Sequence, residues 1–342
     1  MSRVRQENLF ISIMRKVPQN KTAFNKNSLR VLRGENFMYL GFLTVCLGNM
    51  PLKEKAEWAA KNSFKSLEVA CWPNDNDRDY SSCDVDVANL TATEAEEIKA
   101  YIKGFGLTIS SLAYYDNNLH HNLQKRAFIN NHVKKCIDAA VLLEVPAVGT
   151  FVGRNKEKSI KDSFDEFEVV FKDLVEYAEE RNIQLIIENC PMEGWQIPGQ
   201  PGTISFTPEL WREMFRRVPN KNFGLNYDPS HLRFQLIDYI APIAEFKDRI
   251  FHVHAKDSEV FEDKLAYYGV FNKQLDGEGT GYWRFRMPGL GQVDFSAMIK
   301  ALKEIGYDDV VSIEHEDPLY EGSEDKVKEG LLLGREFLEK CL

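Results

Sequence analysis

The sequence predicts an α/β fold, namely a (β/α)8 TIM barrel with a long lid-like insertion before the last strand. Three observations support this prediction. Short apolar segments typical of strands alternate with longer segments of helix-type spacing from residue 39 onward. Eight strand candidates occur, most of them about 40 residues apart, which is the length of one strand, loop and helix. Four of the later candidates carry an acidic or histidine side chain near their carboxyl end.

The predicted elements follow one another in a regular order. The strand candidates begin near Tyr39, Phe64, Leu107, Pro146, Ile183, Asn222, Ile250 and Asp309. The helix candidates cover residues 53–62, 93–104, 125–143, 163–181, 207–217, 238–246, 295–306 and 324–341. Thr93 before acidic residues is typical of a helix start, and Gly106 and Gly306 are typical helix stops. No Gly-x-Gly-x-x-Gly motif follows the first strand, which favours a closed barrel over a doubly wound sheet.

The first 37 residues differ in composition from the rest. Their only acidic residues are Glu7 and Glu35. Their basic residues are Arg3, Arg5, Arg15, Lys16, Lys21, Lys26, Arg30 and Arg33. We interpret residues 1–37 as a basic, disordered extension and residues 38–342 as the barrel; an Arg-rich transit peptide is the alternative.

Composition excludes several classes of protein. The 342 residues carry a formal charge of −9, whereas a nucleic-acid-binding surface needs a basic stripe. No apolar run approaches the ~20 residues that span a bilayer, and no signal-peptide segment appears at the start. Six cysteines without a Cys-x-x-Cys pair indicate reduced thiols. We therefore expect a cytoplasmic enzyme that binds neither nucleic acid nor membrane.

Strand parity predicts that four side chains share one site. Glu188, Asp228, His254 and Glu314 each lie near the end of an apolar segment. Alternate residues of a strand point to opposite faces. In each segment one face is apolar, and the named residue lies on the other face, which grows more polar toward its carboxyl end. This pattern is typical of parallel barrel strands whose inner face opens into a polar pocket.

The chemistry of these side chains indicates a divalent metal. Three carboxylates and one imidazole suit one Mn, Mg or Co ion, and zinc would also fit. His252 competes with His254 because both lie on the same strand face, but His254 is nearer the pocket. The alternative for Glu188 and Glu314 is a structural ion pair with a lysine or arginine of the barrel.

Such a site could move protons on a sugar. A bound cation polarises a ketone or aldehyde, which makes the neighbouring C–H easier to deprotonate. Glu188 and Glu314 lie on strands three places apart, so they could flank the substrate as base and acid. This arrangement predicts isomerisation or epimerisation.

Other residues are candidates for substrate contact. The insertion, residues 258–293, mixes glycines with aromatic residues and arginines, and we interpret it as a lid over the barrel mouth. Arg284 in it could clamp an oxygen or phosphate, or be a solvated charge. Lys256 could contact substrate, or pair with Asp257 or Glu314. His120 lies where a loop could reach the site, although such histidines are usually surface residues.

Several motifs together resemble the xylose isomerase-like TIM barrel superfamily, in particular its sugar phosphate isomerase/epimerase group. They are Ile-Glu-Asn at 187–189, Asp-Pro-Ser-His at 228–231, His-Val-His-Ala-Lys-Asp at 252–257, Ser-Ile-Glu-His-Glu at 312–316 and Pro-Gly-Leu-Gly-Gln-Val-Asp at 288–294. The resemblance covers nearly the whole chain from about residue 38. It implies that Glu188, Asp228, His254 and Glu314 bind one metal ion, and that Glu188 and Glu314 also move protons. It further implies that His231 binds a substrate oxygen, and that the protein forms a homo-oligomer.

The leading hypothesis is therefore a divalent-metal-dependent sugar or sugar phosphate isomerase or epimerase. A metal-dependent lyase or dehydratase is the second hypothesis, since the same site could eliminate water or an aglycone from a 3-keto sugar, a 3-keto glycoside or a keto-inositol. A non-catalytic sugar-binding barrel is the third.

Overall fold

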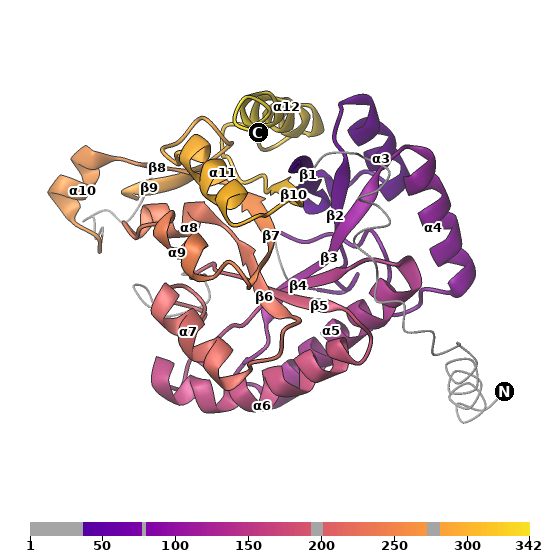
Figure 1. Cartoon of the computed structure of the whole chain (residues 1–342), viewed down its shortest axis with the longest axis horizontal. Coiled ribbons are helices and arrows are strands. Elements are labelled where there is room, and N and C mark those ends of the chain that lie inside the picture. Colours follow the sequence, from indigo (N-terminus) through magenta and orange to yellow (C-terminus); the bar gives the residue numbers. More distant parts are fainter. Residues whose placement is uncertain (1–36, 77–79, 193–200, 272–280) are drawn as a thin grey trace. The chain divides into compact units, whose positions relative to one another are not determined.

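Eight parallel strands close into a barrel, as the sequence predicts. The computed structural model describes residues 37–76, 80–192, 201–271 and 281–342 (Figure 1). The order of strands around the barrel is β1-β10-β7-β6-β5-β4-β3-β2. The strands are β1 Tyr39–Leu43, β2 Ser66–Ala70, β3 Thr108–Asn117, β4 Ala147–Phe151, β5 Gln184–Glu188, β6 Phe223–Tyr227, β7 Ile250–Ala255 and β10 Val310–Ile313. Each begins within two residues of its predicted start. The predicted extension, apart from Phe37, lies outside the described residues.

Helices follow most of the strands and surround the barrel (Figure 1). They are η1 Thr44–Leu47, α3 Leu52–Lys61, α4 Ala92–Gly104, α5 Leu123–Leu143, α6 Ile160–Glu179, α7 Pro208–Arg217, α8 Pro229–Phe234, α9 Ala241–Glu245, α11 Phe295–Glu304 and α12 Glu324–Leu338. The sequence pattern did not predict η1 and α8. It also placed the start of α4 wrongly, because the capping side chain is that of Thr91, which accepts from the amide of Glu94. Gly106 and Gly306 have φ of 72° and 77°, the left-handed conformation expected of helix stops.

Apolar packing between helices and strands holds the barrel in shape. On the outer face of β6, Phe223 packs against Phe167 and Phe171 of α6, with ring centroids 6.1 and 5.7 Å apart. All three side chains are fully buried, and each contributes about 1.5–3 kcal/mol by leaving water. The register of the strands sets Ser312 beside His254 and Glu188 beside Asn226. Polar residues of neighbouring strands therefore meet at the carboxyl end of the barrel.

The predicted insertion contains a small sheet of its own. Strands β8 Asp257–Val260 and β9 Trp283–Arg286 pair in antiparallel fashion, and helix α10 Glu262–Tyr268 follows β8. The ring of Trp283 stacks on Phe234 of α8 at 3.8 Å and 7°, so the sheet is fixed to the helix that follows β6. Its outer end projects beyond α8 and α9 (Figure 1).

A buried carboxylate organises the loop that returns from this sheet to the barrel. Asp257 accepts the backbone amides of Gly289, Gly291 and Val293 at 2.9–3.0 Å. A Cβ at Gly291 would lie 2.3 Å from Oδ1 of Asp257, so this approach requires glycine. The Pro-Gly-Leu-Gly-Gln-Val-Asp motif is thus explained by backbone contacts to one carboxylate.

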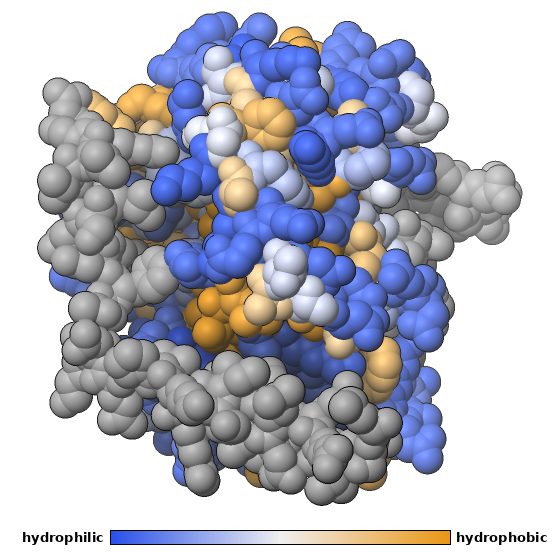
Figure 2. Space-filling view, turned by 90° about the vertical axis from the view of Figure 1, so that its right-hand side faces the viewer, coloured by the Kyte–Doolittle hydropathy of each residue, from blue (hydrophilic) through white to orange (hydrophobic). Residues whose placement is uncertain are grey.

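The face of the molecule in Figure 2 is mainly hydrophilic, with a hydrophobic area near its centre and smaller ones around it. Among the described residues, no helix is long and apolar enough to cross a membrane.

Candidate metal centre

The structure brings Glu188, Asp228, His254 and Glu314 together at the carboxyl end of the barrel. Glu188 is the last residue of β5, Asp228 and Glu314 directly follow β6 and β10, and His254 lies in β7. One ligand atom of each lies within 4.8 Å of those of the other three. All four side chains are buried. Four segments that are distant in sequence therefore build one compact group of metal-ligand type.

The histidines orient the carboxylates of this group. His254 Nδ1 lies 3.0 Å from Glu314 Oε2 and 3.4 Å from Glu188 Oε1. His231, three residues after Asp228 in α8, places Nε2 3.1 Å from Glu188 Oε1 and 3.5 Å from Asp228 Oδ2. The predicted substrate-binding residue His231 thus touches two of the four, with its own Nδ1 lacking a hydrogen-bond partner among the described residues.

The ammonium group of Lys256 lies directly beside the carboxylates of this group. Its buried Nζ lies 2.7 Å from Glu314 Oε2, 3.4 Å from Asp228 Oδ2 and 3.1 Å from Glu316 Oε2. Burial alone would lower the pKa of Lys256, but the charges of Glu314 and Glu316 outweigh burial and raise it well above its usual value. Lys256 therefore stays charged and faces an excess of carboxylates.

The two glutamates differ in protonation. Burial and the charge of Glu188 raise the pKa of Glu314 to about 7. Burial would also raise the pKa of Glu188, but Lys256 and His231 hold it well below its usual value. The pKa values of two carboxyl groups in one pocket therefore differ widely, as expected for an acid and base pair.

A divalent cation fits this group of residues. Oδ2 of Asp228 and Oε2 of Glu314 are buried, and within the described chain their contacts, to Lys256 Nζ at 3.4 and 2.7 Å among others, lack hydrogen-bond geometry. Buried carboxylate oxygens normally accept hydrogen bonds, whereas these two form charge contacts within a group that has more carboxylates than cations. Hard oxygen ligands with one imidazole match Mg, Mn, Co or Zn.

A second polar cluster lies behind His254. Glu68 of β2 accepts from His254 Nε2 at 2.8 Å, from the hydroxyl of Tyr115 at 2.7 Å and from that of Ser312 at 2.9 Å. Burial would raise the pKa of Glu68, but His254 and His252 outweigh it and lower the pKa to about 2. The sequence pattern missed Glu68, although a lone acid within the apolar segment Ser-Leu-Glu-Val-Ala is a usable signal.

The two remaining predicted substrate contacts are not brought into this group. Arg284 of β9 pairs with Glu259 at 2.8 Å, and its register in the small sheet explains this pairing. His120 stacks on His121 and accepts from the amide of Asn122. Neither forms a hydrogen bond or ion pair with the four residues in the described part of the chain. Phe285 of the same strand as Arg284 does reach the neighbourhood of the group. Its ring centroid lies 5.3 Å from that of His231 and 4.4 Å from Lys256 Nζ.

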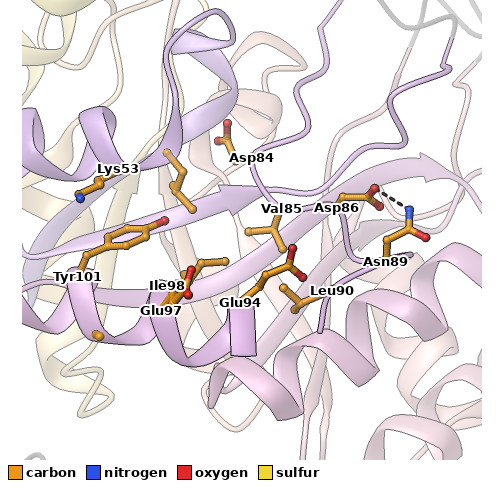
Figure 3. Close-up of a pocket in the computed structure, with 12 residues that line it drawn as sticks. Lys53, Asp84, Val85, Asp86, Asn89, Leu90, Glu94, Glu97, Ile98 and Tyr101 are labelled. Atoms are coloured by element: carbon orange, nitrogen blue, oxygen red, sulfur yellow. Dashed lines mark hydrogen bonds between the residues drawn. The ribbon is translucent and has the colours of Figure 1, made fainter. Parts of the chain in front are cut away.

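A cavity on the surface of the barrel lies away from this group. It has a volume of about 720 Å³ and is open to solvent between α3 and α4, as Figure 3 shows. Its lining is mixed, with Asp84, Asp86 and Glu94 beside Leu90 and Tyr101. It contains none of the metal-ligand residues and we assign it no function.

Similarity to known proteins agrees with the fold. The chain covers only 46% of an uncharacterised protein of Methanocaldococcus jannaschii, with 27% identity over 169 residues. The uncharacterised Bacillus subtilis protein YfiH is 23% identical over 299 residues, which are 82% of this chain and 93% of YfiH. An inosose dehydratase of Lacticaseibacillus casei is 32% identical over 122 residues, covering 34% of this chain and 38% of that enzyme.

Solved structures with the same fold include a D-tagatose 3-epimerase-like protein, with 20% identity and a TM-score of 0.63 over 89% of this chain and 98% of that one. The IolI protein with a bound zinc atom also has 20% identity and a TM-score of 0.63, over 89% of this chain and 96% of IolI. The model of the xylose isomerase-like TIM barrel family matches residues 56–341. The chain therefore belongs to the xylose isomerase-like TIM barrel family.

Proposed function

We propose that this protein is a divalent-metal-dependent isomerase or epimerase of a small sugar or sugar phosphate. The observation that carries the proposal is the buried convergence of Glu188, Asp228, His254 and Glu314 on one centre. The D-tagatose 3-epimerase-like structure supports a sugar as substrate, and the zinc in IolI supports a metal. A cytoplasmic location, a homo-oligomer and the identity of the metal stay predictions.

The residues have distinct tasks in this proposal. Glu188, Asp228, His254 and Glu314 would hold the cation, which when bound polarises a carbonyl beside it and acidifies the adjacent C–H. Glu188, kept ionised by Lys256 and His231, accepts that proton. Glu314, the second glutamate of the group, delivers a proton from the other side. Epimerisation results when the proton returns to the opposite face of the same carbon, and isomerisation when it returns to the neighbouring carbon.

A dehydratase is the second candidate, and Lys256 is the observation that favours it. Its ammonium group is buried, charged and 2.7 Å from Glu314, so it could protonate a leaving hydroxyl after Glu188 removes the proton. The inosose dehydratase similarity agrees with this alternative but covers only 34% of this chain.

Solvent exchange distinguishes the two reactions. The purified protein with added Mn²⁺ is incubated in D2O with free and phosphorylated ketoses and with keto-inositols, and products are analysed by NMR and mass spectrometry. Deuterium in an intact sugar supports the isomerase or epimerase, and loss of water supports the dehydratase. Metal-dependent sugar binding without either change would support the non-catalytic barrel.

Three variants test the assigned residues on whichever substrate turns over. Glu188→Gln and Glu314→Gln should each lower kcat at least 100-fold, because each removes a proton-transfer group. Glu321→Gln, an exposed glutamate of the loop that follows β10, is the matched control and should keep wild-type activity. Full activity of either of the first two variants would refute the assignment.

A further inference from the structure

Glu68 lies on the far side of His254 from the metal-ligand group. We propose that Glu68 is the positioning residue that fixes the His254 ring so that Nδ1 is its metal-binding nitrogen, and that Glu68 thereby sets the affinity of the site for a divalent cation. This inference deepens the proposed function and rests on it.

The geometry around His254 carries the first step. Two groups contact His254 Nε2 at 2.8 Å, namely Glu68 Oε2 and the side-chain amide of Asn226. A carboxylate only accepts hydrogen bonds, and as the charged partner it forms the stronger one, so the contact with Glu68 places a proton on Nε2. Nδ1 is then the nitrogen with the free lone pair in the neutral ring. It is this atom that faces Glu314 and Glu188 at 3.0 and 3.4 Å. The Nε2 edge of the ring is thus held by Glu68, while the Nδ1 edge faces the carboxylates of Glu314 and Glu188.

Glu68 is itself held firmly. It is fully buried, and the hydroxyls of Tyr115 and Ser312 donate to its two oxygens from β3 and β10. Tyr115 also accepts from Asn226 Nδ2 at 2.7 Å. A Cβ at Gly149 would lie 2.5 Å from the Tyr115 hydroxyl, so glycine at this position leaves room for the network. The carboxylate therefore cannot shift without moving three strands.

A second metal site at Glu68, His252 and His254 is the alternative, since these residues also lie close enough together. Their hydrogen bonding argues against it. His252 places Nδ1 2.9 Å from Asn226 Oδ1 and Nε2 3.0 Å from Ser110 Oγ, so both nitrogens are engaged. Both oxygens of Glu68 receive donors as well. The cluster of Glu188, Asp228, His254 and Glu314, by contrast, has two buried carboxylate oxygens whose contacts in the described chain are ion pairs without hydrogen-bond geometry.

The consequence of losing Glu68 follows from its position. A carboxylate behind a histidine ligand fixes the tautomer and ring orientation and raises the basicity of the ligand nitrogen, and its loss typically costs 10–100-fold in metal affinity. Glu68→Gln keeps the size of the side chain but removes the charge. We expect Co²⁺ to bind this variant about 10–100-fold more weakly than the wild type.

The test is a Co²⁺ titration of the full chain, followed by calorimetry and by the visible d–d absorption of the bound ion. Ser312→Ala is the matched control, because it removes one donor to Glu68 but leaves the hydrogen bond between Glu68 and His254 in place. Its Co²⁺ affinity should stay within about threefold of the wild type, below the loss of about 10–100-fold expected when the carboxylate itself is replaced. The d–d bands of Glu68→Gln should shift, whereas those of Ser312→Ala should not. Thermal unfolding of the metal-free variants checks the fold.

The outcomes separate this inference from the proposed function. Wild-type affinity and an unchanged spectrum in Glu68→Gln would overturn the role of Glu68 while leaving the metal site intact. Failure of the wild-type protein itself to bind Co²⁺ would overturn the proposed site, and the inference with it. Should Glu68→Gln not fold, Glu68→Asp keeps the charge at a shorter reach. Glu68→Asp should weaken Co²⁺ binding, but by less than the 10–100-fold expected for Glu68→Gln. Wild-type Co²⁺ affinity in Glu68→Asp would contradict the inference.

Discussion

Two buried lysines show how the same residue type takes different tasks in this chain. Lys55 of α3 is fully buried and donates to Asp84 Oδ1 at 2.6 Å and to the carbonyl of Thr44 at 2.9 Å. Lys256 is equally buried but faces the carboxylates of the candidate metal centre. The first is satisfied by structure alone, whereas the second has more acidic neighbours than it can neutralise. Lys55 is therefore structural and Lys256 belongs to the site.

Substitution of each lysine by methionine should give opposite results. Lys256→Met should lower kcat about 100-fold, because the charge that keeps Glu188 ionised as the base is lost, while the metal stays bound. Lys55→Met should leave Asp84 buried and unpaired and reduce the free energy of unfolding by about 3–5 kcal/mol. Turnover, Co²⁺ affinity and thermal unfolding of both variants check this. Wild-type turnover in Lys256→Met would contradict the role given to Lys256.

At the scale of single residues, strand parity was sufficient to bring four distant side chains to one place, because alternation and the parallel order of a barrel leave little freedom. Strand parity did not identify Glu68, because its contact with His254 depends on how far along the barrel axis β2 lies relative to β7. It does not apply to Arg284, whose role in substrate binding stays a prediction. The partner of that arginine is decided by the register of β8 against β9, which the sequence of a Gly-rich insertion does not specify.

At the scale of elements, the β8–β9 sheet approaches the candidate metal centre from outside the barrel. Stacking of Trp283 on Phe234 fixes the sheet to α8, and this contact places Phe285 beside His231 and Lys256. The length and composition of residues 258–293 predicted an insertion, but not which of its aromatic rings would contact His231; its role as a lid over the barrel mouth stays a prediction. We propose that Phe285 forms an apolar wall against the C–H face of the sugar.

Phe285→Ala tests this role of the sheet. Loss of an aromatic contact of about 0.5–1.5 kcal/mol should raise KM about 2–10-fold, while Co²⁺ affinity stays unchanged because Phe285 is not a ligand. Tyr267→Ala on α10 removes an aromatic side chain that is 81% exposed and should change neither quantity. An unchanged KM in Phe285→Ala would mean that the sheet does not line the substrate site.

For the molecule as a whole, the regular alternation of strands and helices predicted the barrel well, because in most units a strand is followed by a helix that packs against the outside of the barrel. The strand starts agree within two residues, since apolar runs and helix stops mark them directly. The short elements η1 and α8 were missed and α9 was predicted four residues too long, because helices of four to six residues depend on tertiary contacts rather than on their own periodicity.

Removal of residues 1–37 tests the predicted domain boundary. Met38 is buried, and the hydroxyl of Tyr39 donates to Asp309 Oδ1 at 2.7 Å, so the barrel begins at these residues. A chain that starts at Met38 should unfold within about 2 °C of the full chain, equivalent to less than about 1 kcal/mol, and should bind Co²⁺ equally well. A larger fall in Tm would show that the extension contributes to the fold.

The central claim is that one divalent cation binds between Glu188, Asp228, His254 and Glu314. The most direct measurement is a crystal structure of the full chain with Mn²⁺, recorded with anomalous scattering from the metal. The account predicts a single strong peak among the four side chains, on the Nδ1 side of His254. A peak between Glu68 and His252, or no peak at the carboxyl end of the barrel, would contradict it.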